Sequence, residues 1–227
     1  MKPRARQQGS ALLAIMLIAT VAFAAVLLAA FDNSGLQRAR DERTLAMLAQ
    51  ASEALVGFAA THGRLPRPAS GEPAGDGLER AGACASEADC TGLLPWRELG
   101  LPAQDHWGRG LRYSVTPAFT AAPLSRTALV ATKRVLSRDA NGRLFFTAGQ
   151  ESCSLAAQCA PAVILSRGAS DIPDSQDEAG NLAASVDFMQ RPRSSAADAA
   201  GGAFDDLLAT VSLPTLYQRM AAARTLP

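Results

Sequence analysis

Residues 9–32 have the sequence GSALLAIMLIATVAFAAVLLAAFD, in which no charged residue interrupts the apolar run from Ala11 to Phe31. A helix needs about 20 consecutive apolar residues to cross a bilayer. Basic residues favour the cytoplasmic side of such a helix, and three of them precede the run: Lys2, Arg4 and Arg6. The stretch therefore predicts a transmembrane helix over 10–31, with the amino terminus in the cytoplasm and the rest of the chain outside.

Three kinds of segment share a basic start and an apolar core. A cleavable secretory signal has a core of about 7–15 residues, which is shorter than this run, although Leu28-Ala29-Ala30 resembles its cleavage site. A signal anchor keeps its apolar helix without cleavage. The third kind is a leader that ends in Gly directly before the helix, and Gly9-Ser10 fits that pattern. The run alone leaves all three open.

The helix is predicted to continue to His62. Residues 36–62 contain no Pro, and Gly57 is their only Gly. Apolar residues at spacings of three and four line one face of this segment: Leu45, Leu48, Ala51, Leu55 and Phe58. Gly63 can adopt the left-handed conformation that ends helices, and Pro66 follows it. The two halves together make a helix of roughly 50 residues, about 75 Å long.

The four cysteines form two close pairs, Cys84 with Cys90 and Cys153 with Cys159. In an exported domain, such pairs favour two local disulfides. Zinc is the rival interpretation, but zinc ligands are usually separated by about two to four residues. His62 and His106 are also not at finger spacing. Crossed disulfide pairings remain open.

The remainder of the chain is predicted to be a sequence of strands separated by turns. Apolar and β-branched runs indicate strands at 111–115, 128–131 with Val135, 144–147 and 162–165.

Several motifs in this part occur in a fixed order. Asp105, Trp107, Gly108 and Tyr113 lead into the first strand; then come Ser166-Arg167-Gly168, DEAGNL at 177–182 and FDD at 204–206. Together with the leader, these motifs resemble the type IV pilin-like proteins and the minor pseudopilins of type II secretion systems. The resemblance implies a terminal strand at 204–212 and a short closing helix at 213–223.

The resemblance implies that a prepilin peptidase cuts between Gly9 and Ser10 and methylates the new terminus at Ser10. Ala14 stands where the family carries Glu, which implies a minor, tip-like subunit. The resemblance also implies three kinds of partner: other pilin or pseudopilin subunits, the inner-membrane assembly platform and membrane lipid. The expected location is the bacterial inner membrane, single-pass, with the bulk of the chain in the periplasm.

The predicted fold class is α+β, in which a long amino-terminal spine helix, its first half transmembrane, packs on one small antiparallel sheet. The expected divisions are the leader 1–9, the transmembrane helix 10–31, the second half of the spine 32–62 and the head 63–227.

Catalytic and cofactor chemistry is not expected. The carboxylates of Asp171, Asp174, Asp177 and Glu178 are weak candidates for calcium, against the alternative of a solvated acidic loop. Asp205 and Asp206 are predicted at adjacent strand positions, so they should point to opposite faces. No nucleophile elbow is present, and the net charge of +1 gives no electrostatic reason to expect nucleic acid. The sequence predicts a filament subunit, with a membrane-anchored sensor or adaptor as the alternative.

Overall fold

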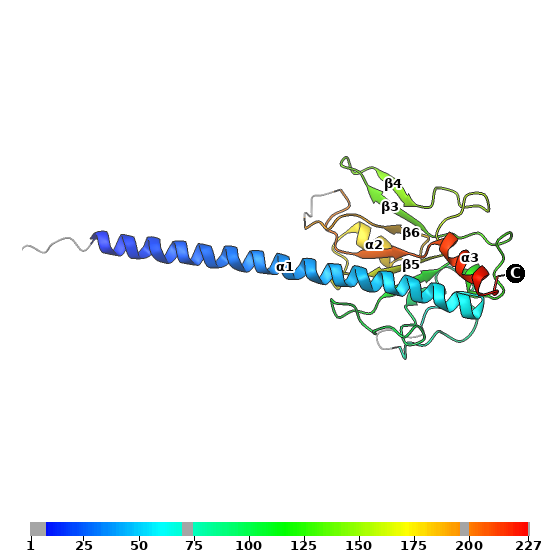
Figure 1. Ribbon diagram of the computed structural model, residues 1–227. Coiled ribbons are helices and arrows are strands. Elements are labelled where there is room, and N and C mark those ends of the chain that lie inside the picture. Colours follow the sequence, from blue (N-terminus) through cyan, green and yellow to red (C-terminus); the bar gives the residue numbers. More distant parts are fainter. Residues whose placement is uncertain (1–7, 70–74, 196–199, 227) are drawn as a thin grey trace, which may run out of the picture. The chain divides into compact units, whose positions relative to one another are not determined.

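The computed structural model describes residues 8–69, 75–195 and 200–226, and within the first range the side chains of 12–27 and 35–69. The chain divides into two compact units, Met1–Glu42 and Arg43–Pro227. Helix α1 (Gln8–His62) belongs to both (Figure 1). It ends as predicted, because Gly63 adopts a φ of 71° and its N–H donates to the carbonyl of Ala59 at 2.9 Å.

The 43–227 unit contains two sheets. In the first, β1 (Thr91–Leu93), β2 (Arg112–Val115), β5 (Ala162–Ser166) and β7 (Leu207–Thr210) lie in that order, and all neighbours are antiparallel. In the second, β3 (Arg134–Arg138) lies between β4 (Leu144–Ala148) and β6 (Asp187–Met189). Strand β3 is antiparallel to β4 and parallel to β6. The described helices of this unit are the end of α1, η1 (Pro117–Thr120), α2 (Gln176–Leu182) and α3 (Leu213–Ala222).

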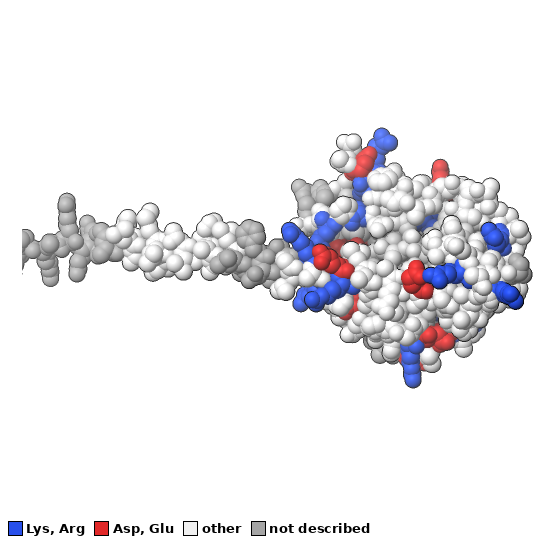
Figure 2. Space-filling view, in the orientation of Figure 1, with Lys and Arg blue, Asp and Glu red and all other residues white. Residues whose placement is uncertain are grey.

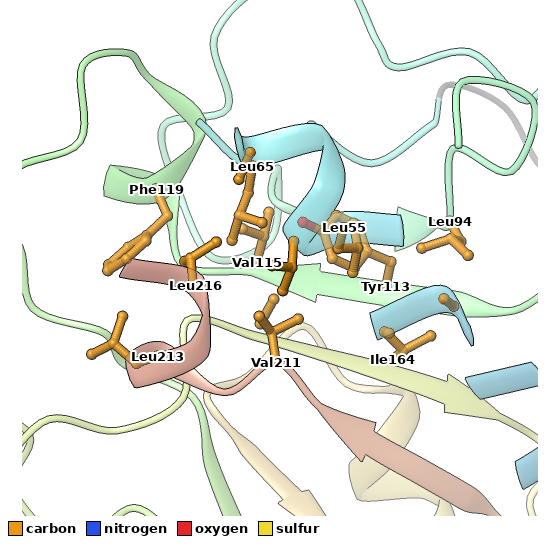
Figure 3. Packing of buried hydrophobic residues seen from close by; sticks show 14 of the residues in the cluster. Leu55, Leu65, Leu94, Tyr113, Val115, Phe119, Ile164, Val211, Leu213 and Leu216 are labelled. Atoms are coloured by element: carbon orange, nitrogen blue, oxygen red, sulfur yellow. The ribbon is translucent and has the colours of Figure 1, made fainter. Parts of the chain in front are cut away.

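Strand β5 is buried on both faces. Ile164 packs with Leu55 of α1 and with Tyr113, Val115 and Val211 (Figure 3). The next side chains along β5 point the other way, and there Val163 and Leu165 pack with residues of the second sheet and of β7: Val135, Phe188 and Leu208. All five residues of β5 are therefore buried, which explains its continuous apolar sequence.

The predicted fold class is wrong in its sheet. The prediction was a spine helix on one small antiparallel sheet, whereas the structure has two sheets and one of them is mixed. The reason is β6, a three-residue strand that no sequence pattern indicated. It pairs in parallel with β3, and parallel neighbours are joined by a long crossover rather than by a tight turn.

The predicted transmembrane helix is also contradicted. Among the residues that the structure describes, no helix is long and apolar enough to cross a membrane. The predicted location, a single-pass protein of the inner membrane, depends on that helix and is contradicted by the same finding.

Candidate functional site: an apolar helix surface and a projecting loop

The first half of α1 carries an apolar surface, defined here by ten side chains that are 43–70% exposed: Leu12, Leu13, Ile15, Met16, Leu17, Ile18, Val21, Phe23, Val26 and Leu27. Successive residues of a helix are rotated by about 100°. The four consecutive residues from Ile15 to Ile18 therefore point in all directions around the axis. Thr20, a polar residue in this stretch, donates its hydroxyl to the carbonyl of Leu17 at 2.9 Å. A helix that is apolar all round is normally buried against other apolar groups.

The second half of α1 buries one stripe within the 43–227 unit. Of the predicted face, Leu48, Ala51, Leu55 and Phe58 are buried. Leu45 is 46% exposed, so the prediction is wrong there. Sequence reasoning missed Met47, Val56 and Ala59, which are buried as well. The stripe is wider than the predicted line because the helix packs against both the first sheet and α3.

The predicted processing residues Gly9 and Ser10 lie in the first turn of α1, and their side chains fall outside the described residues. Residues 1–7 of the predicted leader 1–9 lie outside the described residues altogether. The predicted disulfides are confirmed: Cys84 is bonded to Cys90 and Cys153 to Cys159, with Cα–Cα distances of 5.2 and 5.6 Å.

The four residues considered for calcium are not gathered into one site. The buried carboxylate of Asp177 pairs with Arg138 at 2.7 Å and with Arg191 at 2.9 Å. Asp171 is exposed and lies 3.3 Å from Arg109. The backbone N–H of Asp174 donates to Glu178. Two arginines thus occupy the position that a cation would take beside Asp177.

A different carboxylate cluster is present, made by Glu178, Asp205 and Asp206. One oxygen from each lies within 4.8 Å of the others. The prediction that the two aspartates face opposite sides of a strand is wrong, because β7 begins only at Leu207. The sequence indicates this cluster only through two pairs of adjacent acidic residues, Asp177-Glu178 in α2 and Asp205-Asp206 just before β7.

Protein donors already hold these carboxylates. Glu178 accepts the N–H of Asp205 at 2.8 Å, and Asp206 accepts the side-chain amide of Asn181 at 2.8 Å. Asp205 accepts the N–H groups of Ala169 and Ser170 at 3.1 and 2.9 Å. The cluster therefore ties α2 and the residues before β7 to the loop that follows β5.

The pKa of Asp206 is raised to about 7. Burial is the largest cause, and the negative charges of Glu178 and Asp205 add to it, while the hydrogen bond from Asn181 opposes it. Because this carboxyl is neutral in the folded protein below neutral pH, three carboxyl groups can lie close together without full mutual repulsion.

We call residues 167–174 the projecting loop, because Ile172 is 77% exposed. Arg109 fixes its base by donating to the carbonyls of Gly168 and Ser170 at 2.5 and 2.6 Å. Arg109 is itself positioned by the predicted Asp105 motif, since Asp105 accepts its backbone N–H at 3.0 Å and the hydroxyl of Ser166 at 2.5 Å. The motifs that are far apart in the sequence thus meet at the base of this loop.

Comparison of the chain with protein-family models, with curated proteins and with solved structures found no match.

Proposed function

We propose that this chain is a structural subunit of a pilin-like filament, in which the apolar surface of α1 packs against the same surface of other copies. The observation that carries the proposal is the exposure of that surface on every side of the helix between Leu12 and Leu27. A helix that is apolar on every side is not stable in water unless other apolar groups cover it.

The energetics favour association. Full burial of one Leu, Ile, Val, Met or Phe side chain contributes about 1.5–3 kcal/mol. Joining two proteins costs an estimated 4–15 kcal/mol in lost translational and rotational freedom. The ten side chains of the apolar surface can offset that cost when several copies cover one helix.

The order of the head motifs and the Gly9-Ser10 leader support a pilin-like subunit, with prepilin peptidase and sister subunits as partners. Two disulfides support folding of the head in an oxidising compartment. The role is mechanical, and no catalytic step is assigned. On the face seen in Figure 2, basic and acidic side chains are interspersed over the head, as on an ordinary protein surface.

The test is assembly of the full-length chain, followed by sedimentation and electron microscopy. Leu17→Asp should abolish the assemblies, because it places a charge inside the packed surface. Leu36→Asp is the matched control, since Leu36 is a similarly exposed leucine of the same helix (60% against 66%) but lies outside the apolar surface. A wild-type chain that stays monomeric at all concentrations, or equal loss in both variants, contradicts the proposal.

A further inference from the structure

The 43–227 unit contains an open groove of about 860 Å³. The end of β4 and the loop closed by the second disulfide form one side, and the segment from β7 into α3 forms the other. Its apolar lining includes Leu155, Leu213 and Pro214, and Leu155 is 50% exposed. Ligand sites of this size are mostly apolar with a few polar groups that fix orientation.

One positive charge stands in the lining of the groove. The guanidinium of Arg126 lies 5.6 Å from the centre of the Tyr217 ring, a distance at which the ring face attracts a cation. No acidic side chain lines the groove among the described residues, and Arg126 makes no ion pair with any residue in that part of the chain. The groove is therefore complementary to an apolar side chain that has a carboxylate beside it.

The projecting loop has this chemistry. Ile172 is the most exposed large apolar side chain of the described residues, at 77%, and the acidic residues Asp171 and Asp174 flank it closely. Asp171 already pairs with Arg109 and Arg167. The side chain of Asp174 is exposed and makes no ion pair within the described part of the chain. The carboxylate cluster and Arg109 hold the base of the loop in place, so little conformational freedom is lost when it binds.

The loop cannot reach the groove of its own chain. Strand β5 begins just after Ala160, which lines the groove, and ends at Ser166, directly before the loop. Strand β7 runs the opposite way, from Leu207, which follows Asp206 beside the loop, to Thr210 in the groove. Accordingly, α2, which follows the loop, and α3, which borders the groove, lie toward opposite ends of β5 (Figure 1).

We propose that the projecting loop of one copy docks into the groove of the next, with Ile172 against the apolar wall and Asp174 paired with Arg126. Two different surfaces meet in this contact, so it is heterologous and repeats along a row of subunits instead of closing into a twofold dimer. The inference rests on the proposed filament, to which it adds the contact between heads.

The first test uses full-length protein with a benzophenone amino acid in place of Ile172, irradiated under assembly conditions. Cross-linked peptides are then identified by mass spectrometry in a mixture of isotope-labelled and unlabelled copies. Cross-links from 172 to residues 148–160 or 210–221 of a second copy support the inference. Cross-links to another face or to an unrelated protein, or an absence of cross-links from sedimented assemblies, overturn it.

The second test exchanges the charges. Arg126→Glu and Asp174→Arg should each lower the yield of this cross-link by about tenfold, and the double variant should restore it. Arg143→Glu is the control, because Arg143 is an exposed arginine (85%) outside the groove. A mixture of the two single variants should restore the cross-link, and only between unlike copies, because each loop then meets a groove of opposite charge.

An Arg126→Glu variant that behaves like Arg143→Glu overturns the inference. If the assemblies still sediment in that case, the proposed filament stands without this contact. A wild-type chain that remains monomeric contradicts both the proposed filament and the proposed contact between heads.

Discussion

Asp206 and Glu79 are carboxyl groups whose pKa values move in opposite directions. Burial opposes the charged form of both. For Glu79 the hydrogen bonds from Arg64 and Arg67 outweigh burial and lower the pKa to about 2. For Asp206, Asn181 supplies only a neutral donor and two like charges lie near, so the pKa rises to about 7. Residue identity alone gave no sign of this difference, because it depends on partners far apart in the sequence.

The Asp206→Asn variant should remove a pH dependence of stability. In the wild type, Asp206 is protonated when folded and ionised when unfolded between its ordinary pKa of 3.8 and the folded value of about 7. Its contribution to the free energy of unfolding is therefore complete below about pH 4 and is lost as the pH rises through 7. Urea unfolding between pH 4 and 8 should show a flatter profile for the variant.

Glu79→Gln provides the contrasting control. Glu79 stabilises the protein above its ordinary pKa of 4.5, and this contribution is lost as the pH falls toward 2. The substitution should remove the loss of stability on the acid side and lower the free energy of unfolding by a constant amount from pH 5 to 8, so that the slope of the profile in that interval stays unchanged. An Asp206→Asn profile parallel to that of the wild type across this interval would show that Asp206 ionises normally.

Gly168 at the base of the projecting loop should not tolerate a side chain. It has a φ of 58°, and a Cβ there would lie 2.1 Å from the carbonyl oxygen of Asp205. Gly82 also has a positive φ, of 84°, but has nothing within 4 Å. Gly168→Ala should therefore lose more stability than Gly82→Ala, which carries only the backbone penalty of about 1–2 kcal/mol for a side chain in the left-handed conformation. Equal melting temperatures for the two variants would contradict the close contact.

At the scale of elements, the patterns with strong periodicity were predictable. The end of α1, most of its buried face and strands β2, β4 and β5 follow the predicted segments. The predicted strand at 128–131 is wrong for an identifiable reason. The side chain of Gln158 accepts the N–H of Ala131 at 2.8 Å and donates to the carbonyl of Leu129 at 2.9 Å. The side-chain amide of Gln158 thus takes the place of a neighbouring strand. No pattern within residues 128–131 predicts this contact.

The leader is an element whose processing can be measured directly. Expressed with an active prepilin peptidase, the chain should lose residues 1–9 and carry a methyl group on Ser10, which intact mass spectrometry detects. Without the peptidase, the mass should correspond to an uncut leader. Gly9→Ala is expected to reduce processing, and Gly35→Ala, a change in the same helix, should not. Cleavage after Ala30 in every case would identify an ordinary secretory signal.

At the scale of the whole molecule, the order of elements did not determine how the sheets divide. The parallel pair of β3 and β6 joins Arg134 to Asp187, and the chain between them forms β4, β5 and α2. Such pairings depend on contacts across a long stretch of chain, such as the ion pair of Arg134 with Asp187 at 2.5 Å. Sequence periodicity describes which face of an element is buried, but not against which sheet.

Separation of the two units gives a prediction for the whole molecule. Every described residue of both core clusters lies beyond Glu42, so a chain that begins at Arg43 should unfold cooperatively with nearly the same melting temperature as the full chain. It lacks the apolar surface of α1, and should therefore remain monomeric under conditions in which the full chain assembles. Calorimetry and sedimentation velocity measure the two properties separately. A truncated chain that assembles as readily as the full one would place the main contact in the head, whereas a chain that fails to fold would show that the first unit supports the second.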